Sequence, residues 1–246
     1  MRNILLSVLS FLFVFPCSAQ TESDSLAVNS NFKAGELIVP LSLIGVGSLG
    51  FVEPIKEACV DFQSSVKKWR GDCASTAIDD YLQYVPLASV YGLSLLGADA
   101  KHNYVDRTLE VGVAGVALVG MVGGAKYLIR KERPNGEDFN SFPSGHSAKV
   151  FMGAELVRIE YGEEHPWLAA GAYTLATVTG ALRVYNNHHW LPDVVAGAGV
   201  GILSARIGYW LLPYTKRVMH RLTGWEVFVA PTASSTGAAL NTVVKF

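Results

Sequence analysis

Three short segments of the sequence hold polar residues whose types and spacing suit chemistry on a phosphate group. They are Lys126-x6-Arg133-Pro134, Pro143-Ser144-Gly145-His146 and Arg183-x5-His189-x3-Asp193. A phosphate monoester carries close to two negative charges. A site without a metal must neutralise these charges with fixed cations and hydrogen-bond donors. The three segments contain both kinds of group, so they predict an anion site built from separate parts of the chain.

Three positive charges come from Lys126, Arg133 and Arg183. The planar guanidinium of Arg can bind two phosphate oxygens at once, whereas Lys adds a compact point charge. Ser144 is a preferred residue type for a helix N-cap, and the N–H groups that follow it would point toward an anion. Gly145 has no side chain to keep a substrate from the backbone. We therefore predict that these five residues bind the phosphate.

Each of these residues alone has an ordinary interpretation. Basic residues at the end of a membrane helix usually anchor it at the interface, and Arg130 and Lys131 are assigned to this class. A single histidine near a helix start is usually a cap or a surface residue. His188 does not fit the spacing of the third segment and is given no role. Only the three segments together favour a phosphate site.

The combined pattern resembles the type 2 phosphatidic acid phosphatase (PAP2) superfamily. That family has the signature Lys-x6-Arg-Pro, Pro-Ser-Gly-His and Ser-Arg-x5-His-x3-Asp. Every position matches except the Ser before the last Arg, which is Leu182 here, so the role of that Ser is in doubt. The stretches at 79–86, 140–146 and 183–199 look like the Bacteroidetes-type members that include lipid A phosphatases.

The resemblance implies a role for each matched residue of the reaction. His189 would be the nucleophile that forms a phosphohistidine, and Asp193 would hold its imidazole in the right tautomer. His146 would protonate the leaving alkoxide and later activate water. The resemblance implies no cofactor and no metal ligand.

The elements that must position these residues are apolar helices. Half of the 246 residues are hydrophobic, 17% are charged and 24 are glycine, which favours a lipid environment over a soluble domain. Apolar stretches lie at about 36–52, 84–98, 105–126, 146–160, 167–182 and 193–213. They predict an all-α, membrane-embedded bundle of about five to six helices. Within 111–125, Gly112, Gly115, Gly120 and Gly124 are expected to form a face for close helix packing.

The chain divides into four predicted regions. Residues 1–19 have the basic start, short apolar core and small residues of a cleaved signal peptide, and 20–34 are a polar, flexible mature N-terminus. Residues 35–222 form the phosphatase-like helical domain. Residues 223–246 are a C-terminal extension with the alternation of a short β-hairpin. After export, Cys59 and Cys73 are either disulfide-bonded or free thiols.

The predicted location is the bacterial inner membrane, with the site facing the periplasm. This requires that 36–52 lie on or dip into the membrane without crossing it, or that an N-terminal segment be retained. The predicted substrate is a lipid phosphate from the bilayer, with the 4′-phosphate of lipid A preferred and undecaprenyl diphosphate or phosphatidylglycerol phosphate as alternatives. A soluble acid phosphatase, a vanadate-dependent haloperoxidase and a membrane scaffold are the competing classes. Nothing suggests a nucleic-acid partner, and the oligomeric state is open.

Overall fold

The computed structural model describes residues 32–71, 75–223, 226–234 and 237–245. The helical elements are η1 (Ala34–Leu37), α2 (Ile38–Ser48), η2 (Leu49–Phe51), α3 (Glu53–Arg70), α4 (Ile78–Leu82), α5 (Val85–Leu95), α6 (Tyr104–Ile129), α7 (Gly145–Tyr161), α8 (Pro166–Tyr185) and α9 (Leu191–Thr223). Two strands follow, β1 (Glu226–Ser234) and β2 (Gly237–Lys245). The chain up to α9 is a helical bundle, as the sequence predicts.

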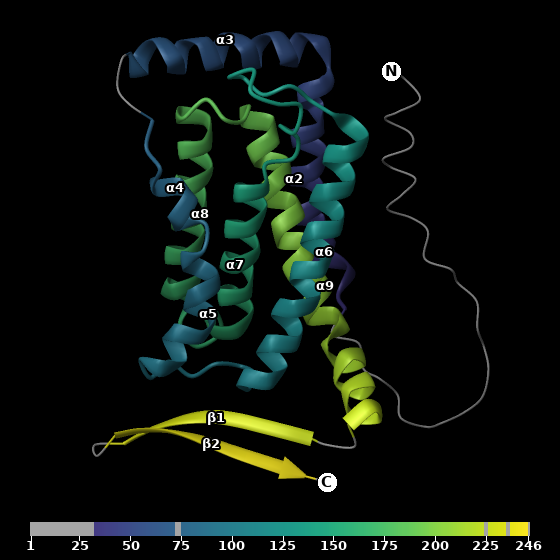
Figure 1. Cartoon of the computed structure of the whole chain (residues 1–246), viewed down its shortest axis with the longest axis vertical. Helices are drawn as coiled ribbons and strands as arrows, with labels where there is room; N and C mark the ends of the chain where they lie inside the picture. Colours follow the sequence, from purple (N-terminus) through teal and green to yellow (C-terminus); the bar gives the residue numbers. More distant parts are fainter. Residues whose placement is uncertain (1–31, 72–74, 224–225, 235–236, 246) are drawn as a thin grey trace, which may run out of the picture.

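Helix α7 is the centre of the bundle and is buried on nearly all sides. It packs against α5, α8 and α9, and Figure 1 shows it between them. Two glycines of α9 permit the closest contact. A Cβ at Gly197 would lie 2.6 Å from the carbonyl oxygen of Ser144, and one at Gly201 would lie 2.2 Å from that of Ala148. The α9 glycines therefore bring its backbone against the start of α7.

The glycines of α6 do not have the packing role expected for them. A Cβ at Gly112, Gly115, Gly120 or Gly124 would meet nothing within 4 Å. The buried face of α6 carries larger residues, such as Leu118 and Val122. The glycine spacing alone did not reveal which face of α6 points inward, and the expectation was wrong.

Helix α2 runs antiparallel to α9 along most of its length. At one end, Arg206 and Trp210 of α9 bind the carboxylate of Glu36, with N–O distances of 2.9 Å in both cases. At the other end, a Cβ at Gly50 would lie 2.6 Å from Cβ of Pro192. Residues 34–51, 104–129 and 191–222 are each long and apolar enough to cross a membrane. Residues 36–52 were expected to lie on the membrane or dip into it without crossing, whereas α2 belongs to a segment of sufficient length and hydropathy to cross and packs along α9.

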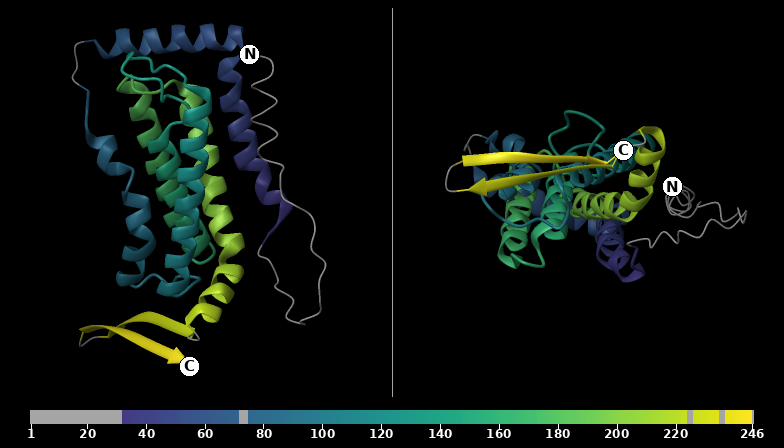
Figure 2. Two further views of the ribbon diagram at one scale, coloured as in Figure 1. Left: turned by 45° about the vertical axis from the view of Figure 1, so that its right-hand side comes forward. Right: turned by 90° about the horizontal axis from the view of Figure 1, so that it is seen from below.

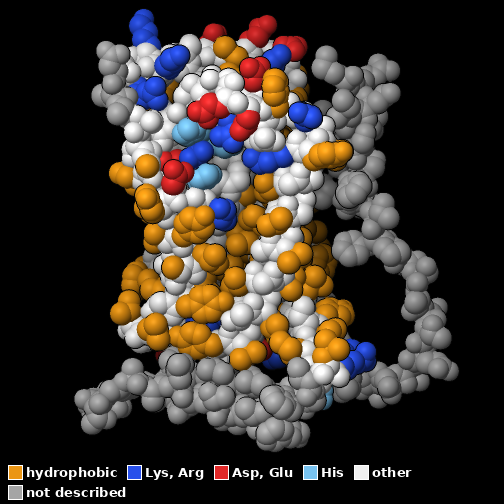
Figure 3. Space-filling view, in the orientation of Figure 1, with side chains coloured by type: hydrophobic (Ala, Val, Ile, Leu, Met, Phe, Trp, Pro, Cys, Tyr) orange, Lys and Arg blue, Asp and Glu red, His pale blue; other side chains and the backbone are white. Residues whose placement is uncertain are grey.

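Helix α3 lies across one end of the bundle, nearly perpendicular to the other helices (Figures 1 and 2). It is tied to the segment after α8. Gln63 Nε2 donates to the carbonyl oxygen of Val184 at 2.9 Å, and Arg70 Nη1 donates to that of Tyr185 at 3.2 Å. Charged side chains gather at this end, above a broad apolar band (Figure 3).

The structure bears on some of the remaining sequence predictions, and others fall on residues that it does not describe. Eight α-helices lie in the described residues, so the count of about five to six is not confirmed. Strands β1 and β2 pair antiparallel, with Glu226 opposite Lys245, and lie across the end opposite α3 (Figure 1). Within the described residues Cys59 has no disulfide partner, so the predicted choice between a bond to Cys73 and free thiols is not tested. The signal peptide at 1–19, most of 20–34, and Cys73 lie outside the described residues.

Candidate active site

Two of the three predicted cations lie at the end of α6 and in the segment that follows it. Lys126 occupies the last turn of α6, and its Nζ donates to the carbonyl oxygen of Asn140 at 2.6 Å. The chain then turns through Arg130, which has φ 47°. Arg133 Nε donates to Asp138 Oδ1 at 2.8 Å. This segment therefore folds back on itself, and both cations stay at the α3 end of the bundle.

Arg183, the third cation, comes from the last turn of α8 and is 4% exposed. Its Nη1 donates to Asp79 Oδ2 at 2.5 Å and to Asp80 Oδ1 at 3.3 Å. Asn186 Nδ2 donates to the other Asp79 oxygen at 2.9 Å. The Nε of Arg183 is buried and has no hydrogen-bond partner among the described residues. A buried N–H without an acceptor is costly, so this donor suits an anionic ligand.

The second motif begins α7 as predicted. Ser144 is the N-cap, and its Oγ accepts hydrogen bonds from the Ser147 N–H at 3.4 Å and the Ser147 hydroxyl at 3.0 Å. Ser144 is fully buried, and the contacts of its hydroxyl oxygen with Ser147 satisfy that oxygen. A Cβ on Gly145 would meet only Val122, at 3.9 Å, which leaves the first turn of α7 open to a ligand.

A hydrogen bond of the His189 ring shows which of its two nitrogens carries the proton. Nδ1 lies 2.8 Å from the carbonyl oxygen of Ser141. A carbonyl oxygen only accepts, so Nδ1 is protonated and the lone pair of the neutral ring lies on Nε2. Burial lowers the pKa of His189 well below its usual range, and the positive charges of Arg133, Arg183 and Lys126 lower it further. The side chain is therefore neutral at pH 7 and nucleophilic at Nε2.

Asp193 forms hydrogen bonds with residues around His189, but it lies too far from the His189 ring to form one with it. Its Oδ2 accepts from Ser141 Oγ at 2.5 Å and from the Trp190 N–H at 3.1 Å, whereas His189 Nδ1 lies 4.0 Å away. The resemblance gave Asp193 a direct hold on the imidazole. In the structure the Ser141 carbonyl makes that contact, and Asp193 fixes Ser141.

Lys131 completes this arrangement. Its Nζ donates to Asp193 Oδ1 at 2.7 Å, and the two side chains are 16% and 0% exposed. The ammonium also lies 4.9 Å from the ring centroid of Phe51 and 5.8 Å from that of Phe142. Lys131 is therefore a partner of Asp193, and its assignment as a membrane anchor was wrong.

His146, in the first turn of α7, faces α4. Its Nε2 lies 3.0 Å from Asp80 Oδ1. Burial, together with the charges of Arg183 and Lys149, lowers the pKa of His146 to about 4, although Asp80 opposes the shift. The imidazole is therefore neutral at pH 7 in the ligand-free protein. Two negative charges on a bound phosphate would raise this pKa, which is the condition for an acid role.

Four residues of the site were not predicted from the sequence: Asp79, Asp80, Lys131 and Ser141. The pair at 79–80 precedes an apolar helix and lies in the stretch 79–86 that resembles the family, but neither signal gave these residues a role. Ser141 acts through its main-chain carbonyl as well as its hydroxyl, and no residue pattern indicates a carbonyl contact.

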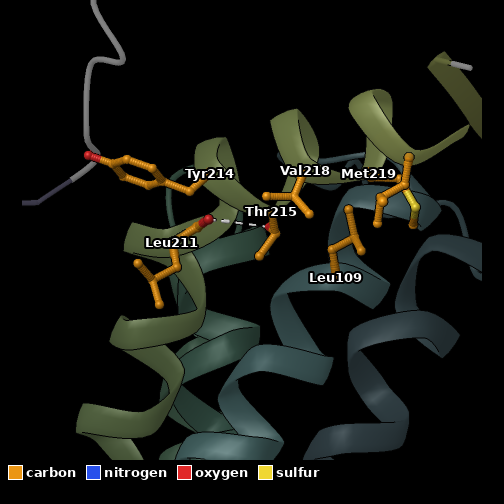
Figure 4. A pocket seen from close by; sticks show the side chains of 7 residues that line it. Leu109, Leu211, Tyr214, Thr215, Val218 and Met219 are labelled. Carbon is orange, nitrogen blue, oxygen red and sulfur yellow. Dashed lines mark hydrogen bonds between the residues drawn. The ribbon is translucent and has the colours of Figure 1, made fainter. Parts of the chain in front are cut away.

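A shallow apolar groove at the other end of the bundle is a different kind of feature (Figure 4). Its lining residues come from α6 and the second half of α9. They are Leu109, Leu211, Tyr214, Thr215, Val218, Met219 and Leu222. No charged side chain lines it, so it does not suit a phosphate.

Comparison with known proteins finds similarity over the region that contains the three motifs. Residues 108–217 match the family model of the PAP2 superfamily. A lipid A 1-phosphatase of Porphyromonas gingivalis is 41% identical over 137 residues, 55% of this chain and 31% of the relative. A bacitracin transport permease protein of Bacillus licheniformis is 32% identical over 87 residues, 35% of this chain and 41% of the relative. The chain thus spans well under half of each curated relative.

Two solved structures are also similar. Aquifex aeolicus LpxE has a TM-score of 0.47 and 18% identity, covering 60% of this chain and 92% of that one. A transmembrane PAP2-type phosphatidylglycerolphosphate phosphatase from Bacillus subtilis has a TM-score of 0.40 and 17% identity, covering 74% and 98%. Both scores are below 0.5, so the assignment rests on the sequence match.

The structure is thus a helical bundle that carries cationic side chains and histidines together at one end. Residues 108–217, somewhat less than half of the 246-residue chain, are similar to the PAP2 superfamily.

Proposed function

We propose that this chain is a membrane lipid phosphatase that hydrolyses a phosphate monoester through a phosphohistidine. The observation that carries the proposal is His189, a buried neutral imidazole with its lone pair on Nε2 and three cations acting on it. Nε2 attacks phosphorus, and the P–O bond to the alcohol breaks. His146 gives the alkoxide its proton, and then takes a proton from the water that hydrolyses the P–N bond. Arg133, Arg183 and Lys126 neutralise the phosphoryl oxygens.

The proposed substrate is lipid A. The support is the 41% identical relative that is a lipid A 1-phosphatase. That relative favours the 1-phosphate, whereas the sequence-based preference for the 4′-phosphate has no support from it.

The experiment is phosphate release from lipid A by the purified chain in detergent. His189→Asn keeps a similar shape but has no nucleophilic ring nitrogen, and we expect no turnover. His188→Asn is the matched control on the adjacent residue and should keep wild-type activity. Tandem mass spectrometry of the product shows which phosphate has left. Loss of activity in both variants, or in neither, would contradict the assignment of the nucleophile.

The intermediate can be tested separately. With lipid A carrying a labelled phosphate, a rapid quench should trap label on the wild-type protein, in a bond that is stable to alkali and labile to acid. His146→Ala should accumulate this label if water activation is slowed more than attack. Turnover by the wild type with no trapped label at any time would point to direct attack by water.

The proposed location is the inner membrane, with the site facing the periplasm. The orientation of α2 adds a condition. Glu36, before α2, contacts Arg206 and Trp210 of α9, whereas Phe51, after α2, lies beside Lys131 at the site. If α2 crosses the membrane, a periplasmic site puts Glu36 in the cytoplasm, and this is incompatible with cleavage and export after Ala19. Residues 20–33 are too few for another span. Of the two N-terminal alternatives, the proposal therefore requires a retained segment.

This condition is directly measurable. The mass of the protein purified from membranes shows whether residues 1–19 are present. A cysteine placed at the exposed Asp99, at the end opposite the site, should be protected from an impermeant thiol reagent in intact cells. Its labelling without permeabilisation would reverse the proposed orientation.

A further inference from the structure

A second polar cluster lies at the end of the bundle away from the phosphate site, where α6 begins and α7 ends (Figure 1). Its members are His102, Glu110 and Glu160. One ligand atom from each lies within 4.8 Å of the others. None of these residues was singled out from the sequence, and none belongs to the phosphate site.

The carboxylate of Glu110 is the unexplained group. The residue is 1% exposed, and neither side-chain oxygen has a hydrogen-bond partner among the described residues. Glu160 is also buried, at 3% exposure, and one of its side-chain oxygens lies within 4.8 Å of an oxygen of Glu110. Buried carboxylates without a partner are strongly unfavourable, and proteins pair them, protonate them or place a metal ion between them.

The nearby cations do not neutralise Glu110. Lys101 Nζ lies 3.2 Å from Glu163 Oε1, on the exposed side of the cluster. Arg107 is fully buried one turn before Glu110, but its Nη1 donates to the Val90 carbonyl, Ser94 and Tyr161. Neither residue forms an ion pair with Glu110 within the described part of the chain.

The donor atoms suit a divalent transition metal. His102 Nδ1 lies 2.7 Å from Glu160 Oε1 and 3.9 Å from Glu110 Oε2. Zinc bonds of about 2.0–2.1 Å in tetrahedral geometry need ligand atoms roughly 3.3 Å apart, a value between these two distances. One imidazole nitrogen and two carboxylate oxygens leave a fourth position for water. Mg²⁺ and Ca²⁺ prefer all-oxygen sites with six or more ligands, so they fit less well.

The ligands are held by the surrounding backbone. The His102 N–H donates to Glu160 Oε2 at 3.0 Å, and the Lys101 N–H donates to the Glu160 carbonyl oxygen at 2.9 Å. The segment before α6 is thus fastened to the end of α7 before any ion binds. Such fixed ligands lower the ordering cost of metal binding.

We propose that His102, Glu110 and Glu160 bind one zinc-class divalent ion that joins the start of α6 to the end of α7. The ion is structural and lies outside the phosphate chemistry. It neutralises the two buried carboxylates and bridges two helices whose other ends carry Lys126 and Ser144.

The test uses the full chain without a histidine tag, stripped with a chelator and dialysed against zinc chloride. Elemental analysis should find one zinc per chain. At a free zinc concentration 100 times the dissociation constant, the thermal midpoint should rise by roughly 5–10 °C. Magnesium chloride at the same concentration should produce no comparable rise. The stripped protein should keep its phosphatase activity.

Three variants locate the ion. Glu110→Gln and Glu160→Gln keep the side-chain shape and remove one anionic ligand, so each should weaken zinc binding by at least tenfold. Glu163→Gln makes the same charge change on an exposed residue three positions away and should bind zinc as the wild type does. The metal-free midpoint of Glu110→Gln should equal or exceed that of the wild type, because a buried charge is lost. This midpoint shows that the variant is folded.

Two results would overturn the proposal. One is less than half an equivalent of zinc on the wild type, in which case a proton shared between Glu110 and Glu160 explains the cluster. The other is equal zinc affinity in Glu110→Gln and the wild type, which would place the ion elsewhere on the chain.

Discussion

Lys131→Met tests whether the phosphate site depends on the residue that neutralises Asp193. At 2.7 Å and an effective dielectric constant near 20, the attraction of Lys131 and Asp193 is about 6 kcal/mol, and desolvation offsets part of it. Removing one partner of a buried pair typically costs about 3–5 kcal/mol, because the other charge stays buried. We expect a loss of stability in this range.

The activity of Lys131→Met should fall as well. Asp193 holds Ser141 and the Trp190 N–H, and Ser141 holds the His189 ring. A displacement of about 1 Å at a nucleophile can cost on the order of 100-fold in rate, so we expect a drop in kcat of about 10–100-fold. KM should change less, because the ammonium of Lys131 is paired with Asp193 and is not one of the three predicted phosphate-binding cations.

The control is Arg130→Met, which removes the same charge from an exposed neighbour with no expected cost beyond about 0.5 kcal/mol. Thermal unfolding and phosphate release are measured on both proteins in the same detergent. The double variant Lys131→Met/Asp193→Asn should regain stability but not activity, because the unpaired charge is gone while the hold on Ser141 is weakened. If Lys131→Met matches Arg130→Met in both assays, the reasoning about the pair is wrong.

Three further predictions follow from the site. Asp79→Asn removes the buried partner of Arg183 and should lower the thermal midpoint by roughly 6–12 °C, for a cost of about 3 kcal/mol, whereas Asp99→Asn on the surface should not. Because the pKa of His146 is about 4 in the free protein, the proton for the leaving group must arrive with a monoanionic substrate. We therefore expect kcat/KM to fall above roughly pH 6, where a phosphate monoester loses its second proton. A maximum of kcat/KM above about pH 7.5 would contradict this. Vanadate should inhibit, since it resembles the transferring phosphoryl group, whereas chelators should leave turnover unchanged; inhibition reversed by added metal would show a catalytic ion.

The motif residues were predictable because their chemistry depends on side-chain type and on short fixed spacings. Ser144 caps α7, and the charges of Lys126, Arg133 and Arg183 all act on His189, as a single anion site requires. The spacing of residues within one helix or turn depends only on neighbouring positions in the sequence. The all-helical architecture was accessible for the same reason, since apolar stretches of helical length are read directly from the sequence.

Partners from distant elements could not be predicted in this way. The contact of Asp79 with Arg183 joins positions 104 residues apart, and that of Lys131 with Asp193 joins positions 62 apart. A charged residue at the end of an apolar helix has the same sequence signature whether it meets lipid headgroups or a buried carboxylate. The packing of α9 determines which of these environments Lys131 has.

The same limit explains why the packing of the glycines and of α2 was not predicted. A helix rich in small residues can present them to lipid or to a neighbour, and only the neighbour's position distinguishes the two. In α6 the glycines lie away from other helices, whereas Gly197 and Gly201 of α9 meet α7. Helix α2 pairs with α9 through Glu36 and Gly50, which are contacts that its hydropathy does not indicate.

Residues that precede the matched family region complete the site. Asp79 and Asp80 of α4 hold Arg183 and His146, and Gln63 of α3 holds the segment after α8. A fragment limited to residues 108–217 would keep the three motifs and lose these partners. Arg183 would then be buried without a counter-charge, and His146 would lose the one carboxylate that opposes the lowering of its pKa. Helix α4 therefore contributes the carboxylates that face Arg183 and His146, and α3 holds the segment that follows α8, so both helices belong to the candidate site.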